Sequence, residues 1–164
     1  MSATPMFSVP VQASGTDERY TPPWMFADLG RFDLDPCAPE GGPFHGHADR
    51  WFTAADDGLA QPWEGRVFMN PPFSDASPWA TKFTDHGDGV ALVPISNAAW
   101  RFRMTRHADL IWLPDDFPFI GQNHAQQRVS MPVMLVAFGP VNVDALTALA
   151  RSGRHPGVLL ERVT

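Results

Sequence analysis

The chain has 164 residues, of which 44% are hydrophobic and 18% charged, so it is long enough for one domain with a buried core and does not have the composition of a disordered chain. The formal net charge of −6 excludes a uniformly basic nucleic-acid-binding surface, and no apolar run approaches the roughly 18 residues of a membrane span. The single cysteine, Cys37, excludes an internal disulfide, so a reducing cytoplasm is the expected compartment.

The first part of the chain is predicted to contain a leader, a short helix and a strand. Residues 1–19 show no periodicity and are assigned to a flexible leader, which precedes a single domain over residues 20–164. The segment TPPWMFADLG favours a short helix that Thr21 caps and Gly30 ends. The alternating residues 31–35 predict a strand, followed by the turn-rich loop PCAPEGGP.

The remainder alternates between strands and helices. Strands are predicted in the short apolar runs, over residues 66–69, 89–95, 109–113 and 131–138, with an edge strand over 157–163. Helices are predicted between them, over 77–86 with Ser77 as N-cap, from Ser96 or Asn97 to Arg106, and over 142–153. This alternation indicates an α/β fold with a mostly parallel sheet, in which ligands bind beyond the carboxyl ends of the strands.

The tetrapeptide Asn70-Pro71-Pro72-Phe73 comes directly after a predicted strand. Its two prolines fix φ near −65° and remove two backbone donors, and they keep the preceding Asn70 extended. The corner therefore presents two acceptors, the Asn70 side-chain oxygen and the Pro71 carbonyl, which match the two hydrogens of an exocyclic amine. The Phe73 ring offers a flat face for a planar base. A plain turn, with the phenylalanine packed in the core, explains the same residues.

These residues, together with others in the same order, resemble the phage-type (Dam-like) DNA N6-adenine methyltransferases. NPPF is similar to the [DNS]-PP-[YFW] motif of amino-group methyltransferases that depend on S-adenosylmethionine. Four collinear segments carry the resemblance: YTPPWMF (20–26), FDLDPCA (32–38), ADDGLAQPWEGRVFMNPPFS (55–74) and GVALVPISNAAW (89–100).

The resemblance implies a compact, minimal Rossmann-like methyltransferase sheet, mostly parallel with a C-terminal antiparallel hairpin. It also implies methyl transfer from S-adenosylmethionine to the N6 amine of a flipped adenine in double-stranded DNA, by an enzyme encoded by a phage or prophage. Methylation of cytosine N4 or of another planar amine is an alternative, because the same two acceptors suit any planar amine. A catalytically silent DNA- or protein-binding module with this fold is another.

The resemblance carries roles to particular positions. Asn70, Pro71, Pro72 and Phe73 would form the catalytic motif. The residues expected to contact the cofactor lie in the family's other motifs: Thr21, Pro22, Asp35, Pro36, Cys37, Ala38, Asp56 and Asp57. Among them, Asp35 would lie near the methionine amino group of the cofactor, and Asp57 would face its adenine or ribose, with Asp56 as the competitor. The chain departs from the family in lacking the glycine-rich loop D-x-F-x-G-x-G and in having Phe73 where tyrosine is commoner.

Charge is unevenly distributed along the chain. Residues 28–64 hold a large excess of acids, whereas residues 97–107 carry arginines and no acid. Four arginines are candidate DNA contacts: Arg101, Arg103, Arg106 and Arg128. An ordinary solvated helix face explains the first three equally well. The polar segment 117–132 is predicted to be a loop between two strands, and it contains side chains of the types that read base edges, namely Gln122, Asn123, Gln126 and Gln127. A disordered or merely solvated loop explains these residues equally well.

Cys37, His45 and His47 lie close together in the sequence but lack the paired spacing of a metal site. A surface loop without a metal is therefore predicted for the two histidines. Cys37 has no base near it in the sequence, and it is predicted to be a small buried thiol and not a nucleophile.

Overall fold

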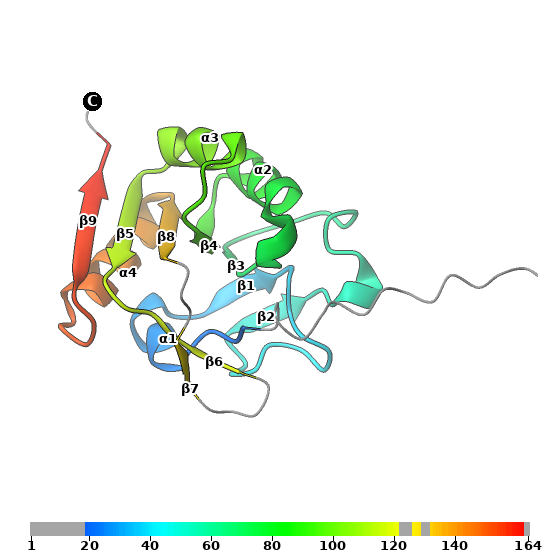
Figure 1. Ribbon diagram of the computed structural model, residues 1–164. Helices are drawn as coiled ribbons and strands as arrows, with labels where there is room; N and C mark the ends of the chain where they lie inside the picture. Colours follow the sequence, from blue (N-terminus) through cyan, green and yellow to red (C-terminus); the bar gives the residue numbers. More distant parts are fainter. Residues whose placement is uncertain (1–18, 122–125, 129–131, 163–164) are drawn as a thin grey trace, which may run out of the picture.

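A computed structural model describes residues 19–121, 126–128 and 132–162, with the side chains of 126–128 excepted. Its main sheet has seven strands: β1 (Phe32–Asp35), β2 (Ala48–Trp51), β3 (Val67–Met69), β4 (Gly89–Pro94), β5 (Leu110–Pro114), β8 (Val133–Phe138) and β9 (Gly157–Glu161). They lie in the order β2-β1-β3-β4-β8-β5-β9 (Figure 1). β1 to β4 pair in parallel, whereas β8 is antiparallel to both β4 and β5, and β9 is antiparallel to β5. The predicted α/β class, with a parallel core and antiparallel C-terminal strands, is confirmed.

Four helices cover the two faces of this sheet. α1 (Trp24–Leu29) and α4 (Pro140–Arg151) pack together on one face, and α2 (Ala76–His86) and α3 (Ala99–His107) pack together on the other (Figure 1). Every residue of β4 and of β8 is buried, because both strands lie between the two helical layers. The apolar run at 89–95 predicted such a strand. Within the described residues, no helix has the length and apolar character needed to cross a membrane.

The predicted helix ends are only partly correct. Gly30 ends α1 with φ of 75°, as expected. Thr21 does not cap α1, however: the N-cap is Pro23, and no side chain bonds to the helix end. Ser77 does not cap α2 either. A 3₁₀ turn, η2 (Phe73–Asp75), leads directly into α2, so Ser77 lies inside the first helical turn.

The strand β2 and a second, small sheet were not predicted from the sequence. β2 follows β1 without an intervening helix, and three of its four residues are exposed, so it has no apolar pattern. β6 (Pro118–Ile120) and β7 (Gln126–Arg128) form a separate two-stranded antiparallel sheet inside the segment predicted to be a loop. Ile120 of β6 also forms an isolated bridge with Tyr20.

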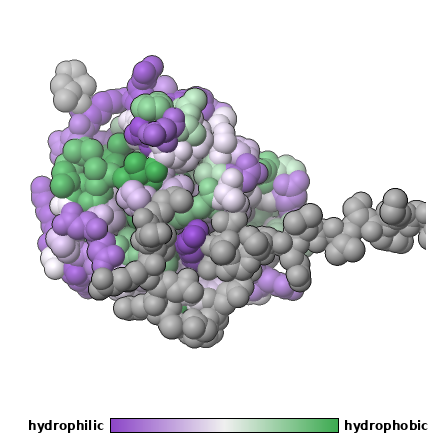
Figure 2. Space-filling model, in the orientation of Figure 1, coloured by the Kyte–Doolittle hydropathy of each residue, from purple (hydrophilic) through white to green (hydrophobic). Residues whose placement is uncertain are grey.

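The edge strand predicted at the C-terminal end is β9. Val158 and Leu160, on one face of the strand, are 53% and 45% exposed. They pair with Leu113 and Ile111 of β5, and Figure 2 shows an apolar surface over these two strands.

A buried polar cluster joins the two halves of the fold. The Asn142 side chain of α4 is fully buried and donates to Asp88 Oδ1 (2.8 Å) and to the Phe138 carbonyl (2.7 Å). Its oxygen accepts from Arg66 Nε (2.5 Å), while Arg66 Nη2 donates to the Leu29 carbonyl at the end of α1 (2.7 Å). The amide of Asn142 thereby links α4 to α1 and to the segment entering β3.

Replacing this amide should therefore destabilise the whole fold. Asn142→Ala is expected to lower the free energy of unfolding by about 2 kcal/mol, since it leaves buried polar partners without hydrogen bonds. The exposed neighbour provides a control: Val141→Ala should change the same quantity by less than about 0.5 kcal/mol. Urea unfolding followed by circular dichroism measures both, and equal effects would contradict the structural role of Asn142.

Candidate active site

Asn70 lies half-buried at the carboxyl end of β3, and its side-chain amide is fixed by the chain near residue 20. Nδ2 donates to the Arg19 carbonyl (2.8 Å) and lies 3.3 Å from Thr21 Oγ1. Because a carbonyl oxygen can only accept, the amide nitrogen must face Arg19. Oδ1 consequently faces away from Arg19, and it accepts no hydrogen bond from the described part of the chain.

The two prolines leave a second acceptor at this corner. The Pro72 carbonyl accepts the Asp75 N–H (3.2 Å) and so closes the turn η2. The Pro71 carbonyl has no such partner among the described residues. The predicted pair of acceptors, Asn70 Oδ1 and the Pro71 carbonyl, is therefore present at the end of β3.

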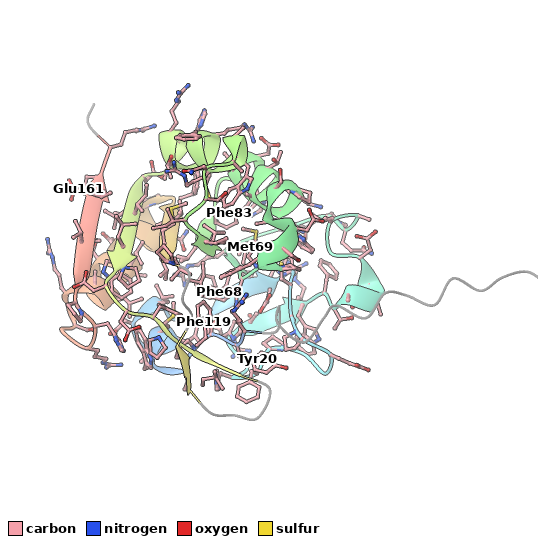
Figure 3. The ribbon with its side chains drawn as sticks, in the orientation of Figure 1. Tyr20, Phe68, Met69, Phe83, Phe119 and Glu161 are labelled. Carbon is pink, nitrogen blue, oxygen red and sulfur yellow. The ribbon has the colours of Figure 1, made fainter. Side chains whose placement is uncertain are left out.

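The Phe73 ring is held by side chains from two distant segments. Its edge meets Phe119 of β6 at a centroid distance of 5.8 Å and an interplanar angle of 82°. The Arg19 guanidinium carbon lies 5.2 Å from the Phe73 ring centroid. Phe119 is fully buried, and Figure 3 shows it on β6 close to the core residue Phe68. The position of Phe73 is thus set by contacts outside the NPPF segment.

A groove lies next to the corner, at Phe73. Its volume is about 490 Å³, and it runs from η2 to the connection between β4 and α3. Phe73, Ile95 and Trp100 are among the residues that line it. Of the four NPPF residues, Phe73 lines this groove, whereas Pro71 is buried and Asn70 is half-buried beside it.

The next candidate, Asp35, ends β1 and is buried. Its Oδ1 accepts the Cys37 N–H (3.0 Å), and its Oδ2 lies 2.8 Å from His47 Nε2. The His47 ring, also buried, stacks on Phe26 of α1 at 4.0 Å. Both carboxylate oxygens of Asp35 thus have partners inside the protein, and they fix the turn formed by Pro36, Cys37 and Ala38.

The two aspartates of the DDGL segment differ in their surroundings. Asp56 Oδ2 accepts both the Thr53 N–H and the Thr53 hydroxyl, each at 2.8 Å, and these hydrogen bonds, that of the main-chain N–H above all, lower the pKa of the Asp56 carboxyl. Asp57 adopts a left-handed conformation with φ of 52° and is exposed, and its carboxylate accepts no hydrogen bond from the described residues. Asp57 is therefore the aspartate available to a ligand.

Gly58 brings the DDGL segment against the DPCA turn. A Cβ atom at this position would lie only 2.2 Å from the Pro36 carbonyl oxygen, so no larger residue allows the observed approach. The exposed Asp57 and the end of β1 consequently lie at one edge of the sheet.

The three candidate arginines of α3 have different partners. Arg103 pairs with Asp85 of α2, and Arg101 donates to the Ser96 carbonyl and covers the Phe102 ring. Arg106 is exposed and makes no ion pair within the described ranges. The backbone of Arg128 lies in β7, whereas its side chain, like those of Gln126 and Gln127, is outside the described structure, and Gln122 and Asn123 lie outside the described residues altogether.

Sequence reasoning missed three residues that shape this site: Arg19, His47 and Phe119. Arg19 falls in the segment assigned to the leader, and Phe119 lies in the unrecognised strand β6. His47 pairs with Asp35 although it was predicted to lie on a surface loop. No group of three or more potential metal ligands occurs among the described residues.

Comparison with models of known protein families identifies the family of the chain. A family model with the description "DNA N-6-adenine-methyltransferase (Dam)" matches residues 11–147, well over half of the chain. That range includes every candidate residue named above and begins inside the segment predicted to be a leader. No curated protein sequence matches the chain.

The surroundings of Cys37 predict an unreactive thiol. Burial, followed by the negative charge of Asp35, raises the pKa of the Cys37 thiol well above its usual value. The thiolate is the reactive form, so modification by a disulfide reagent at pH 8 should be much slower in the native protein than in the unfolded one. Because Cys37 is the only cysteine, the absorbance of the released thiol reports on it alone. Equal rates in the two states would contradict the raised pKa of the thiol.

Proposed function

The chain belongs to the Dam family of DNA N-6-adenine-methyltransferases, and we propose that its NPPF corner, residues 70–73, holds the amine that is methylated. Members of this family transfer a methyl group from S-adenosylmethionine to N6 of adenine in DNA, and this is the activity of the chain. The observation that carries the proposal for the corner is the fixed amide of Asn70, whose nitrogen bonds to the Arg19 carbonyl and whose oxygen is left to accept.

The chemistry required of this corner follows from the nature of the amine. The lone pair of adenine N6 is delocalised into the ring, which makes the nitrogen a poor nucleophile. Asn70 Oδ1 and the Pro71 carbonyl accept its two hydrogens, and this favours a pyramidal nitrogen whose lone pair is exposed for attack. S-adenosylmethionine, when bound, supplies an electrophilic methyl group. The corner contains no strong base, so the proton that N6 loses passes to water, and catalysis rests on positioning and electrostatics.

The substrate is proposed to be double-stranded DNA with the target adenine flipped out of the stack. An adenine inside a duplex cannot present N6 to a corner at the end of a strand. The groove beside Phe73 has polar and apolar lining residues, and the side chains of Ile95 and Trp100 supply apolar surface that suits a planar base. Phe73 is proposed to stack on that base, and the missing tyrosine hydroxyl is not needed for stacking.

The residues at the ends of β1 and β2 fit a nucleoside cofactor. Asp57 supplies an exposed carboxylate that can accept from hydroxyl or amino groups, and Trp51, 45% exposed at the end of β2, supplies a flat apolar surface. We assign Asp57 to the adenosine part of the cofactor and Asp56 to local capping. Asp35 is proposed to act mainly by holding the turn of residues 36–38, and Pro22 is retained as a cofactor contact.

Contacts to the DNA backbone are proposed for Arg106 and Arg128. Arg101 and Arg103 have partners inside the protein, whereas Arg106 is exposed without an ion pair in the described structure.

We further propose that residues 20–164 act as one methyltransferase unit and that the preceding residue, Arg19, contributes to its site. The proposed compartment is the cytoplasm of a bacterial host, where both substrates are present.

The activity is tested by incubating the protein with unmethylated DNA and S-adenosylmethionine carrying a labelled methyl group. After digestion to nucleosides, the label is expected in N6-methyladenosine. Label in N4-methylcytidine would reassign the substrate, and no label in DNA would contradict the function.

The role of Asn70 is tested by removing its amide. Asn70→Ala is expected to lower the rate of methyl transfer at least about 100-fold, because no other side chain at the corner accepts from N6. Its affinity for S-adenosylmethionine, measured by calorimetry, and its melting temperature should stay close to wild type. Val141→Ala, which changes an exposed side chain of α4 on the other face of the sheet, serves as the control. Wild-type turnover in Asn70→Ala would remove Asn70 from the mechanism.

Substitutions of the two aspartates of DDGL are expected to have different effects on cofactor affinity. Asp57→Asn is expected to weaken the affinity for S-adenosylmethionine about tenfold, the usual loss for one hydrogen bond to a charged group. Asp56→Asn keeps an acceptor for Thr53 and should leave the affinity near wild type. Calorimetry with both variants measures this difference, and the reverse order would assign the cofactor contact to Asp56.

A further inference from the structure

Residues 19–21, here called the strap, lie between the catalytic corner and the small sheet of β6 and β7. On one side, the Tyr20 N–H donates to the Ile120 carbonyl (2.8 Å), and the Ile120 N–H donates to the Tyr20 carbonyl (3.0 Å). On the other side, the Arg19 carbonyl and the Thr21 hydroxyl meet Asn70 Nδ2. Figure 3 shows Tyr20 beside β6. The strap is thus bonded on one side to β6 and on the other to the amide of Asn70.

The orientation of the Asn70 amide decides whether the corner can work. Rotating an asparagine amide by half a turn exchanges its oxygen and its NH2 group with almost no change of shape. In the reversed orientation, NH2 would face the hydrogens of the target amine, and donors would meet donors. The reversed orientation would also place Oδ1 against the Arg19 carbonyl, where two oxygens repel each other. The main chain of the strap therefore selects the working orientation.

Thr21 completes this arrangement. An amide NH2 group has two hydrogens, and the Arg19 carbonyl accepts only one of them. Thr21 Oγ1, at 3.3 Å, is placed to accept the second, and Thr21 is only 6% exposed, so water does not readily take its place. Thr21 does not cap α1, which leaves its hydroxyl for Asn70.

We propose that Thr21 is a positioning residue for methyl transfer: together with the Arg19 carbonyl, it holds the Asn70 amide with its oxygen toward the target amine. This inference rests on the proposed function of Asn70. It gives Thr21 a role that differs from the contact with the cofactor implied by family resemblance. The two roles predict different kinetics, because a positioning residue changes the rate of the step and a cofactor contact changes affinity.

The test compares Thr21→Val, which keeps the shape and removes the hydroxyl, with Thr21→Ser, which keeps the hydroxyl. In Thr21→Val, kcat is expected to fall about tenfold, while the dissociation constant for S-adenosylmethionine stays within about twofold of wild type. Thr21→Ser should restore kcat to within about twofold of wild type. Unchanged kcat in Thr21→Val, or weaker cofactor binding with unchanged kcat, would overturn the proposal.

A second readout does not depend on activity. The side-chain NH2 resonances of Asn70 are identified by their loss from the NMR spectrum of Asn70→Ala. Their exchange with solvent is expected to be faster in Thr21→Val than in the wild type and unchanged in Thr21→Ser. Exchange that is unaffected by Thr21→Val would overturn the contact itself. Full activity of Asn70→Ala would instead refute the proposed role of Asn70, and the exchange rates would still show whether Thr21 holds the amide.

Discussion

The hydrogen bond from Asn70 Nδ2 to the Arg19 carbonyl is the contact on which the proposed catalytic corner depends. A main-chain carbonyl has no hydrogen to donate, so it fixes which end of the amide faces it. The two prolines that follow Asn70 have no N–H groups, and the corner is consequently lined by acceptors. An amine with two hydrogens is the natural partner of such a surface. The adenine N6 amine, which the Dam family methylates, has two such hydrogens.

The sheet brings the parts of the site together from segments that are far apart in the sequence. Asn70 follows β3, and Asp35 ends the neighbouring strand β1. Because parallel strands present their carboxyl ends at the same edge of the sheet, the two residues lie at one edge. The close approach at Gly58 adds the DDGL segment to this edge without an intervening helix. In this chain the end of β1 is held by a turn, the packed Gly58 and the buried Asp35–His47 pair, in place of the glycine-rich loop D-x-F-x-G-x-G.

The sequence predicted the parts of this structure that depend on local pattern. The apolar runs that became β4 and β8 were recognisable because both of their faces are buried, and Gly30 marked the end of α1. β2 was missed since three of its four residues are exposed. The assignment of Thr21 as a helix cap was wrong because the residue is used by Asn70, which is distant in the sequence. Local preference cannot reveal such a contact. Asp56 and Asp57 were not distinguished from the sequence, although a local signal was available. The spacing of Thr53 and Asp56 is that of a capping box, which indicates that the Asp56 carboxylate bonds to Thr53.

The most direct test of the central claim is a crystal structure of the protein with duplex DNA containing the target adenine and a non-reactive analogue of S-adenosylmethionine. The account predicts that the adenine lies outside the stack, with its N6 at hydrogen-bonding distance from Asn70 Oδ1 and the Pro71 carbonyl, while Asn70 Nδ2 still bonds to the Arg19 carbonyl. A complex in which the amide of Asn70 is reversed, or in which N6 contacts no atom of residues 70–73, would contradict it.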